Sequence, residues 1–453
     1  SKYIFSFLFL LVFSIVATEI SAQTRISSPY SRFGIGDIYN SYNARSLAMG
    51  GIGFSLQSDR YINFLNPASF AGFKARSFVF EGGINSNFVK LETDNKSQKS
   101  NYTSLGYLAF GFPVTKWWGS SFGLLPYSNI GYKISSNDSL QNIGNVNYKF
   151  EGEGGINRLY WGNSFELIDS TLSIGFNASY LFGSLDRIRT AVFLDSLNYF
   201  DIKITDSRIV NGVMLSYGLQ YRKKLKPKNS ERKIILFKNS NQNKTKQTLF
   251  FESGFTFNMG SKISAKKESL TERIQLNTFG LEIIQDTIEN ITDIKGDIKI
   301  PLSFGAGIAL RGGNKWLIGF DYSIQNWSDY TSFGEIDTLA NSMNAAFGAE
   351  YTPKYTNLPK YWEKIHYRVG ARYSKTYLQI RDNQLLEYAA SFGLGAPIFV
   401  KVGNQLKEYA TLNIGVELGK RGTTDNDLIL ENFTRITFGI VIKDFLARPR
   451  KYE

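Results

Sequence analysis

The sequence predicts an all-β protein, namely a transmembrane antiparallel β-barrel of about fourteen strands with an N-terminal hatch in the lumen. Composition is the first observation behind this prediction. Aromatic residues make up 15% of the 453 residues, there are 41 Gly and only 10 Pro, and the mean hydropathy is −0.20. Such a chain is too polar for a helical membrane protein and too aromatic for a disordered one. An apolar N-terminal leader and a repeated apolar-polar alternation are the other two observations.

The N-terminus has the features of a secretory signal peptide. Lys2 precedes an apolar stretch from Tyr3 to Val16, and the small residues Ser21 and Ala22 stand just before Gln23. We therefore expect residues 1–22 to be cleaved off. The alternative is a transmembrane anchor, but the apolar run is shorter than the roughly 20 residues that span a bilayer.

Strand-length segments repeat one period-two pattern. Three clear cases are residues 172–183, 316–325 and 365–373, in which apolar residues alternate with polar or small ones. One apolar and one polar side indicate a face that meets hydrocarbon and a face that meets a polar interior. A soluble β-sandwich also alternates, but the strand length, the aromatic residues at strand ends and the leader disfavour it.

The barrel is expected to span residues 77–445. The expected strands are 77–91, 102–114, 119–134, 155–168, 171–183, 210–223, 247–260, 299–311, 315–327, 340–352, 364–378, 385–395, 408–419 and 433–445. Short gaps follow the second, fourth and eighth strands, and outer-membrane barrels have their short turns on the periplasmic side. We therefore expect an outer-membrane location with both termini periplasmic, including a tail at 446–453.

The longer gaps divide into two groups. Residues 135–154, 184–209 and 261–299 are expected to be extracellular loops, whereas 224–246, 353–363 and 396–407 are long connections on the periplasmic side. The segment from Arg222 to Lys246 holds ten Lys or Arg against one acid, Glu231. It is either a solvated turn or a docking site for a periplasmic partner or anionic headgroups.

Several kinds of chemistry are excluded or disfavoured. The chain has no Cys and one histidine, His366, so thiolate and multi-histidine metal sites are excluded. We expect no enzyme activity, no catalytic residues, no metal and no cofactor. The net charge is +13, but the basic residues do not gather along one face, so no nucleic-acid partner is expected. Outer-membrane lipid is the expected surrounding partner.

Residues 23–76 are expected to form a hatch that fills the lumen. They contain five phenylalanines that need burial, Phe33, Phe54, Phe64, Phe70 and Phe73. A barrel of this size has a lumen that wall side chains alone do not fill. A small periplasmic subdomain is the alternative.

Two glycine-containing motifs carry a family resemblance. The first comprises Gly50, Gly51 and Gly53 followed by Asn66, Pro67 and Ala68, and the second comprises Gly152, Gly154 and Gly155. The first resembles the hatch of the FadL-like outer-membrane transporters, and the second resembles the glycine cluster that opens that family's fourth strand.

The resemblance implies two functions, which both stay open. One is passive uptake of hydrophobic small molecules through a plugged lumen. The other is that of a PorV-like accessory subunit, which carries nothing and belongs to a larger envelope complex for secretion or assembly. No residue-level match to the family's ligand pockets is found.

The resemblance also implies a lateral opening beside the third strand, where a kink breaks the pairing with a neighbour. Here Pro126 falls in the middle of that strand and has no N–H to give to the sheet. Ser128 and Asn129 follow at once, and we expect them to satisfy the freed backbone groups. A β-bulge without any opening is the alternative.

Overall fold

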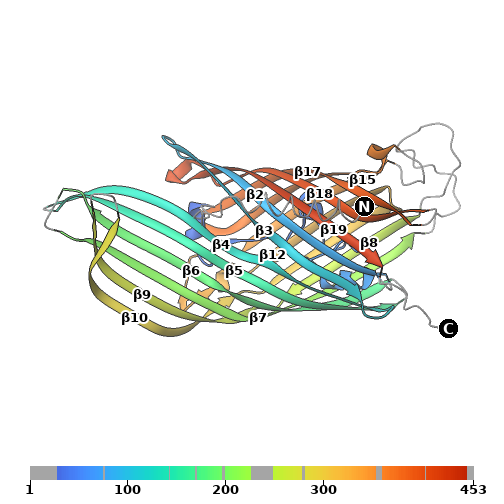
Figure 1. Ribbon diagram of the computed structural model, residues 1–453, viewed down its shortest axis with the longest axis horizontal. Helices are drawn as coiled ribbons and strands as arrows, with labels where there is room; N and C mark the ends of the chain where they lie inside the picture. Colours follow the sequence, from blue (N-terminus) through green and yellow to red (C-terminus); the bar gives the residue numbers. More distant parts are fainter. Residues whose placement is uncertain are drawn as a thin grey trace.

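The computed structural model describes residues 28–74, 77–141, 143–168, 171–195, 199–225, 248–277, 281–353, 360–402 and 405–445. Over these residues the chain forms one antiparallel sheet that closes into a barrel (Figure 1). The wall strands are β2 (Ser77–Glu92), β3 (Ser97–Pro113), β4 (Trp118–Leu140), β5 (Gly144–Ile168), β6 (Leu172–Phe193), β7 (Asp201–Leu225), β8 (Leu249–Asn258), β9 (Ser261–Leu276), β10 (Glu282–Ile300), β11 (Ser303–Gly312), β12 (Trp316–Gln325), β15 (Ser342–Tyr351), β16 (His366–Ile380), β17 (Asn383–Val402), β18 (Gln405–Arg421) and β19 (Leu430–Phe445).

The remaining elements are short. They are the strands β1 (Asp37–Ile38), β13 (Thr331–Ser332) and β14 (Glu335–Ile336), the helix α2 (Ala44–Leu47), and the 3-10 helices η1 (Pro29–Arg32), η2 (Pro67–Gly72), η3 (Trp327–Asp329), η4 (Tyr361–Glu363) and η5 (Asp425–Asp427). Among the described residues, no helix has the length and apolar character that crossing a membrane requires.

The described wall has fourteen strand positions, which confirms the prediction. β8 and β9 share one position because both pair with β7, and β10 and β11, which are separated by Pro301, share the next. The barrel closes between the last strand and the first: β19 pairs with β2 over sixteen residues, from Leu430 opposite Glu92 to Phe445 opposite Ser77.

Side chains alternate across the wall as the period-two pattern predicts. On β12, Phe320 is 45% exposed and points outward, whereas the next residue, Asp321, is 1% exposed and points inward. Neighbouring outward rings contact one another, as between Phe110 and Phe122, whose centroids are 5.2 Å apart. An apolar outer surface around a polar interior is the pattern of a barrel in lipid.

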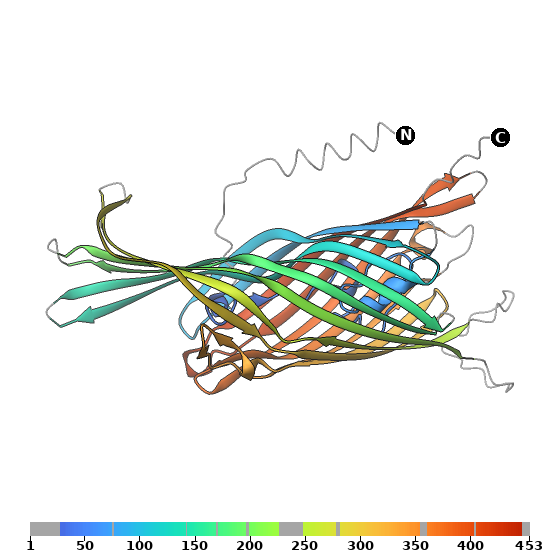
Figure 2. The same cartoon turned by 90° about the horizontal axis from the view of Figure 1, so that it is seen from below.

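The two ends of the barrel differ. We call the end where β2 begins and β19 ends the terminal end, and the opposite one the far end. At the far end β4 to β7, β9 and β10 continue past the rest of the wall as a projecting sheet (Figure 2). Residues 135–154, 184–209 and 261–299 were predicted as loops, and this prediction is wrong, because most of these residues are paired strand.

The cause of the error is physical. The apolar-polar alternation reports contact with lipid on one face, whereas backbone pairing continues where both faces meet water. The connection predicted at 396–407 is also mostly strand, since β17 runs to Val402 and β18 starts at Gln405.

Residues 28–74, which come before β2, lie within the ring of strands (Figure 2). We call residues 28–74 the N-terminal segment. Its helix η2 packs against β3 to β7, and α2 packs against β17 to β19. Phe64, Phe70 and Phe73 are at most 6% exposed and form a core with wall residues such as Tyr107 and Tyr160. Phe33 and Phe54 are half-buried.

This core predicts a large loss of stability for Phe70→Ala. The Phe70 ring is fully buried and stacks with Phe73 and Tyr160 at centroid distances of 6.1 and 6.5 Å. Removing a buried phenylalanine ring costs about 3–5 kcal/mol of unfolding free energy. When samples are heated stepwise before a detergent gel, the folded band of the variant should therefore disappear at a lower temperature than that of wild type. The control is Phe320→Ala on the lipid face, and an equal shift in both variants would contradict the prediction.

Candidate functional site

The predicted Pro126 motif and the predicted strand-four glycine motif meet at one kink in the wall. The β4–β5 pairing shifts register between Pro126 and Ser128, and beyond the shift Asn129 lies opposite Gly155 and Ile130 opposite Gly154. Gly154 has a φ of +107°, and a Cβ there would lie 2.3 Å from the Ser184 carbonyl oxygen. The kink therefore requires glycine at this position.

The other glycines of the motif allow close packing at the same place. A Cβ at Gly155 would lie 2.4 Å from the Ser128 carbonyl oxygen, and one at Gly152 would lie 2.1 Å from the Tyr132 ring. The backbone of β5 thus approaches β4 more closely than any side chain would permit.

At the kink β4 leaves its other neighbour, β3. The described β3–β4 pairing runs from Pro113 opposite Gly119 to Leu108 opposite Leu124 and ends there, although both strands continue. Beyond this point β4 pairs with β1 of the N-terminal segment, with Ile38 opposite Ser128.

Further backbone contacts extend this substitute pairing. The Tyr39 N–H donates to the Tyr127 carbonyl over 2.9 Å, and the Ser28 N–H donates to the Gly131 carbonyl over 3.1 Å. The expectation that Ser128 and Asn129 satisfy the freed groups is wrong. The Ser128 hydroxyl and the Asn129 amide nitrogen are buried without a partner among the described residues. The N-terminal segment supplies backbone partners for β4 instead.

Two hollows lie on either side of residues 37–41. The larger, of about 260 Å³, is lined by Phe64, Tyr127, Arg158, Met214 and Trp327 among others. The smaller, of about 120 Å³, is lined by Tyr102 and Gly106 of β3, Pro126 of β4 and Arg435 of β19. The smaller hollow therefore reaches the place where β3 and β4 separate. Both hollows mix apolar and charged side chains.

The glycines of the predicted hatch motif lie against the side of the barrel formed by β12 and β15 to β17. Gly50 has a φ of +68°, and a Cβ there would lie 2.6 Å from the Ala371 carbonyl oxygen and 2.7 Å from that of Phe347. Its N–H donates to the Ser391 hydroxyl over 2.7 Å. Gly51 packs on the Tyr42 ring, and the Gly53 N–H donates to Asp321 Oδ2 over 2.6 Å. These glycines let the segment contact β12 and β15 to β17.

The second part of that motif, Asn66, Pro67 and Ala68, begins η2. The Asn66 side chain accepts from the Ala68 N–H and donates to the Phe54 carbonyl over 2.7 Å, so it caps the helix and joins two turns of the segment. The Ser164 hydroxyl donates to the Ala68 carbonyl over 2.7 Å. The structure thus brings the Pro126 and Gly152 motifs together. The glycines of the hatch motif lie against β12 and β15 to β17, whereas Asn66 to Ala68 start η2, which packs against β3 to β7.

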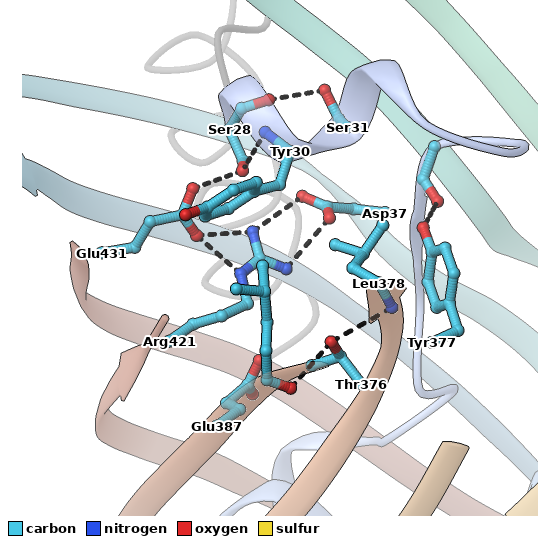
Figure 3. A network of polar contacts seen from close by, with 12 residues as sticks. Ser28, Tyr30, Ser31, Asp37, Thr376, Tyr377, Leu378, Glu387, Arg421 and Glu431 are labelled. Carbon is cyan, nitrogen blue, oxygen red and sulfur yellow. Dashed lines mark hydrogen bonds and ion pairs between the residues drawn. The ribbon is translucent and has the colours of Figure 1, made fainter. Parts of the chain in front are cut away.

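A network of ion pairs, which the sequence patterns did not reveal, holds the start of the segment. The Arg421 guanidinium of β18 pairs with Asp37 at 2.9 Å and with Glu431 at 2.6 Å (Figure 3). Glu431 also accepts from the Ser28 hydroxyl. Arg421 therefore connects two strands of the wall to both ends of residues 28–37.

Tyr30 closes the same network. Burial raises the pKa of its hydroxyl to about 12, so the group keeps its proton at neutral pH. The hydroxyl donates to the Ile429 carbonyl over 2.7 Å and accepts from the Ile429 N–H over 2.8 Å.

A second ionic cluster lines the same side of the lumen. Arg372 of β16 pairs with Glu387 and Glu417 at 2.7 and 2.9 Å, and Arg435 of β19 pairs with the same two carboxylates. All four residues stand at inward positions of adjacent strands. Charged residues at the polar positions of the period-two pattern are the sequence signal that could have identified them.

His366, the one histidine of the sequence, takes part in a polar contact. Its Nδ1 lies 2.7 Å from the Thr352 hydroxyl, a contact without a serine nucleophile. In the described part of the chain, no group of three or more acidic or histidine side chains could hold a metal ion. The predicted signal peptide (1–22), most of the basic segment (226–246) and the predicted tail at 446–453 lie outside the described residues.

Solved structures with the same fold are channels and transporters. The monoaromatic hydrocarbon channel CymD is 13% identical over 91% of this chain and 99% of its own, with a TM-score of 0.51. The toluene transporter TbuX of Ralstonia pickettii is 13% identical over 88% and 98%, with a TM-score of 0.55. The toluene transporter TodX of Pseudomonas putida is 15% identical over 90% and 98%, with a TM-score of 0.50. No curated protein matches the sequence.

The closed fourteen-strand wall and these likenesses define a β-barrel with the FadL-like fold. The model of one family, BamG, matches residues 4–242 and 237–453. The chain belongs to the BamG family.

The ion pairs of Arg421 predict that Arg421→Gln loosens the start of the N-terminal segment. The guanidinium is about one-tenth exposed, so its loss leaves Asp37 and Glu431 buried without a cation. Hydrogen exchange at residues 28–39 should become at least about tenfold faster, because losing a buried charge partner costs on the order of 3 kcal/mol. The control is Arg381→Gln, whose ion pair with Asp427 is largely exposed. Unchanged exchange in Arg421→Gln would show that the network does not hold the segment.

Proposed function

We propose that the protein lets hydrophobic small molecules cross the outer membrane passively, and that they leave its lumen sideways between β3 and β4. In this proposal the residues from Gln23 to residue 76 form a hatch that blocks a straight path along the barrel axis. The observation that carries the proposal is the end of the β3–β4 pairing at Leu108 and Leu124, because a hollow of about 120 Å³ reaches that place.

The two hollows suggest the route. A solute that enters the larger hollow meets Phe64, Met214 and Trp327, which offer apolar contact. Residues 37–41 separate it from the smaller hollow, whose lining includes Tyr102, Gly106 and Pro126. From there the way out passes between β3 and residues 37–39, which pair with β4, and it breaks no described β3–β4 hydrogen bond.

The alternative is a β-bulge without an opening. The bulge lies on the side of β4 that faces β5, not on the side that faces β3. The register shift at Pro126 belongs to the β4–β5 pairing, which resumes at Ser128 and continues to Leu140. The lost pairing belongs to β3. A bulge alone accounts for the first feature but not for the second, which supports a lateral opening.

The route predicts that Gly106→Trp blocks uptake. Gly106 lines the smaller hollow, and the three atoms nearest to a Cβ there belong to the Asn85 side chain, the first at 2.9 Å. An indole that displaces this side chain would fill the space beside the gap. Uptake of radiolabelled toluene by cells with an intact outer membrane should fall to the rate of cells that lack the protein. Gly82→Trp is the control, because that position meets Phe80 and Leu108 side chains at 3.5 Å or more. Undiminished uptake in Gly106→Trp would exclude this exit.

A second candidate function is that of an accessory subunit in a larger envelope complex. The projecting sheet at the far end favours it (Figure 2). Its β10 pairs with β9 along one edge, whereas along the other edge the described pairs are those of Ile298 and Lys299 with β13. Ile283 and Ile288 on this strand are 47% and 48% exposed. An open strand edge with exposed isoleucines is a surface that another protein chain can cover.

Affinity purification in mild detergent separates the two functions. An accessory subunit should co-purify with envelope proteins in near-equal amounts, and the double variant Ile283→Lys with Ile288→Lys should lose them while keeping its folded band. The control is Ile336→Lys. Ile336 is 80% exposed and lies outside β10. Recovery of the wild-type barrel alone, with toluene uptake intact, would leave transport as the function.

A further inference from the structure

The outer surface of β19, β2 and β3 carries an ordered change from apolar to basic residues. Outward positions on these strands lie opposite one another in rows. Going toward the far end, the rows are Ile440, Gly82 and Leu108, then Phe438, Ile84 and Leu105, then Ile436, Ser86 and Thr103, then Thr434, Phe88 and Asn101, then Asn432, Lys90 and Lys99. Phe88 is the last aromatic side chain of this series and is 45% exposed.

The row of lysines stands where the membrane surface is expected. Aromatic side chains mark the boundary between hydrocarbon and headgroups on outer-membrane barrels. One row corresponds to two residues, or about 5 Å along the membrane normal for a tilted strand. Lys90 and Lys99 therefore lie one row beyond the aromatic boundary, at the depth of lipid headgroups.

Without a bound anion, the positions of these lysines would destabilise the wall. Lys90 lies directly opposite Lys99, and like charges in such a position destabilise a sheet. Lys420 of β18 extends the same row beside Asn432. The one carboxylate in contact with the row is that of Glu92, which pairs with Lys90 and accepts from the Asn432 amide over 2.5 Å. Within the described chain, Lys99 and Lys420 have no acidic partner.

A hollow of about 490 Å³ opens outward at this place. It is lined by three consecutive residues on each of the three strands, 88–90, 99–101 and 432–434. The side chains that point outward offer ammonium and amide donors from Lys90, Lys99 and Asn101 above the ring of Phe88. Phosphate oxygens accept from such donors, and an acyl chain can follow Phe88 toward Ile84.

We propose that this hollow binds the phosphorylated headgroup of an outer-membrane lipid. The lysines hold the phosphate, Asn101 adds a hydrogen-bond donor, and Phe88 contacts the start of an acyl chain. The site lies on the outer surface next to the unpaired edge of β3, so it does not depend on what passes through the lumen. Lipid is the occupant rather than free phosphate because the hollow ends at the Phe88 row, and the outward positions that follow toward the terminal end include Ile436, Ile84 and Leu105.

The test uses the purified full-length barrel in nanodiscs of phosphatidylcholine with one-fifth phosphatidylglycerol. Native mass spectrometry after mild detergent release should find phosphatidylglycerol retained on the wild-type protein. The double variant Lys90→Gln with Lys99→Gln should retain less, by about fivefold for each lysine. The control Lys133→Gln with Lys262→Gln removes the same charge at the far end, where each lysine is ion-paired, and should retain lipid as wild type does.

Two further arms decide between occupants. Retention that survives an excess of inorganic phosphate supports a lipid site, whereas retention abolished by it overturns the lipid assignment in favour of a phosphate site. Equal loss in the Lys90/Lys99 variant and in the control would show general charge attraction and would also overturn the proposal. Both variants alter outward side chains, and the heat-modifiable folded band confirms that each remains a barrel.

Discussion

The backbone hydrogen bonds of β4 are the constraint on which the rest of the structure depends. A membrane-spanning strand has no water to satisfy its N–H and carbonyl groups, so a wall strand that loses one neighbour must find another. β4 loses β3 at Leu124 and takes the N-terminal segment instead, through β1 and the contacts of Ser28 and Tyr39. The segment is thus part of the wall as well as a filling of the lumen, and its ion pairs with β18 and β19 keep it in that position.

The interior of the barrel is stabilised by buried ion pairs, unlike the apolar core of a soluble protein. Arg372, Glu387 and Glu417 are almost fully buried, and each of these three has an opposite charge within hydrogen-bond distance. Burying single charges without partners costs several kcal/mol, so these groups are stable only as a set. Their mutual register across four neighbouring strands makes that set possible, and it also makes the interior specific for one arrangement of the N-terminal segment.

Sequence reasoning identified the number of wall strands because lipid contact imposes a period of two on each of them. It started β5 and β7 too late, ended β6 too early and missed β9 entirely, since the same signal fades where strands meet water on both faces. Pro126 and Gly154 were each identified from their backbone chemistry, but their meeting depends on the strand register. The partners of β4 were predicted wrongly because Ser128 and Asn129 are adjacent in sequence, whereas Ile38 and Ser28 are about ninety or more residues away.

The contact between Tyr30 and Ile429 joins residues separated by 399 positions along the chain. It links the first described element to the approach of the last strand, so it forms only after nearly all of the wall is in place. The pairing of β1 with β4 needs only residues up to Asn129, whereas the Tyr30 contact has to wait for Ile429. Until β1 is in place, the edge of β4 needs a temporary partner or must stay out of the hydrocarbon.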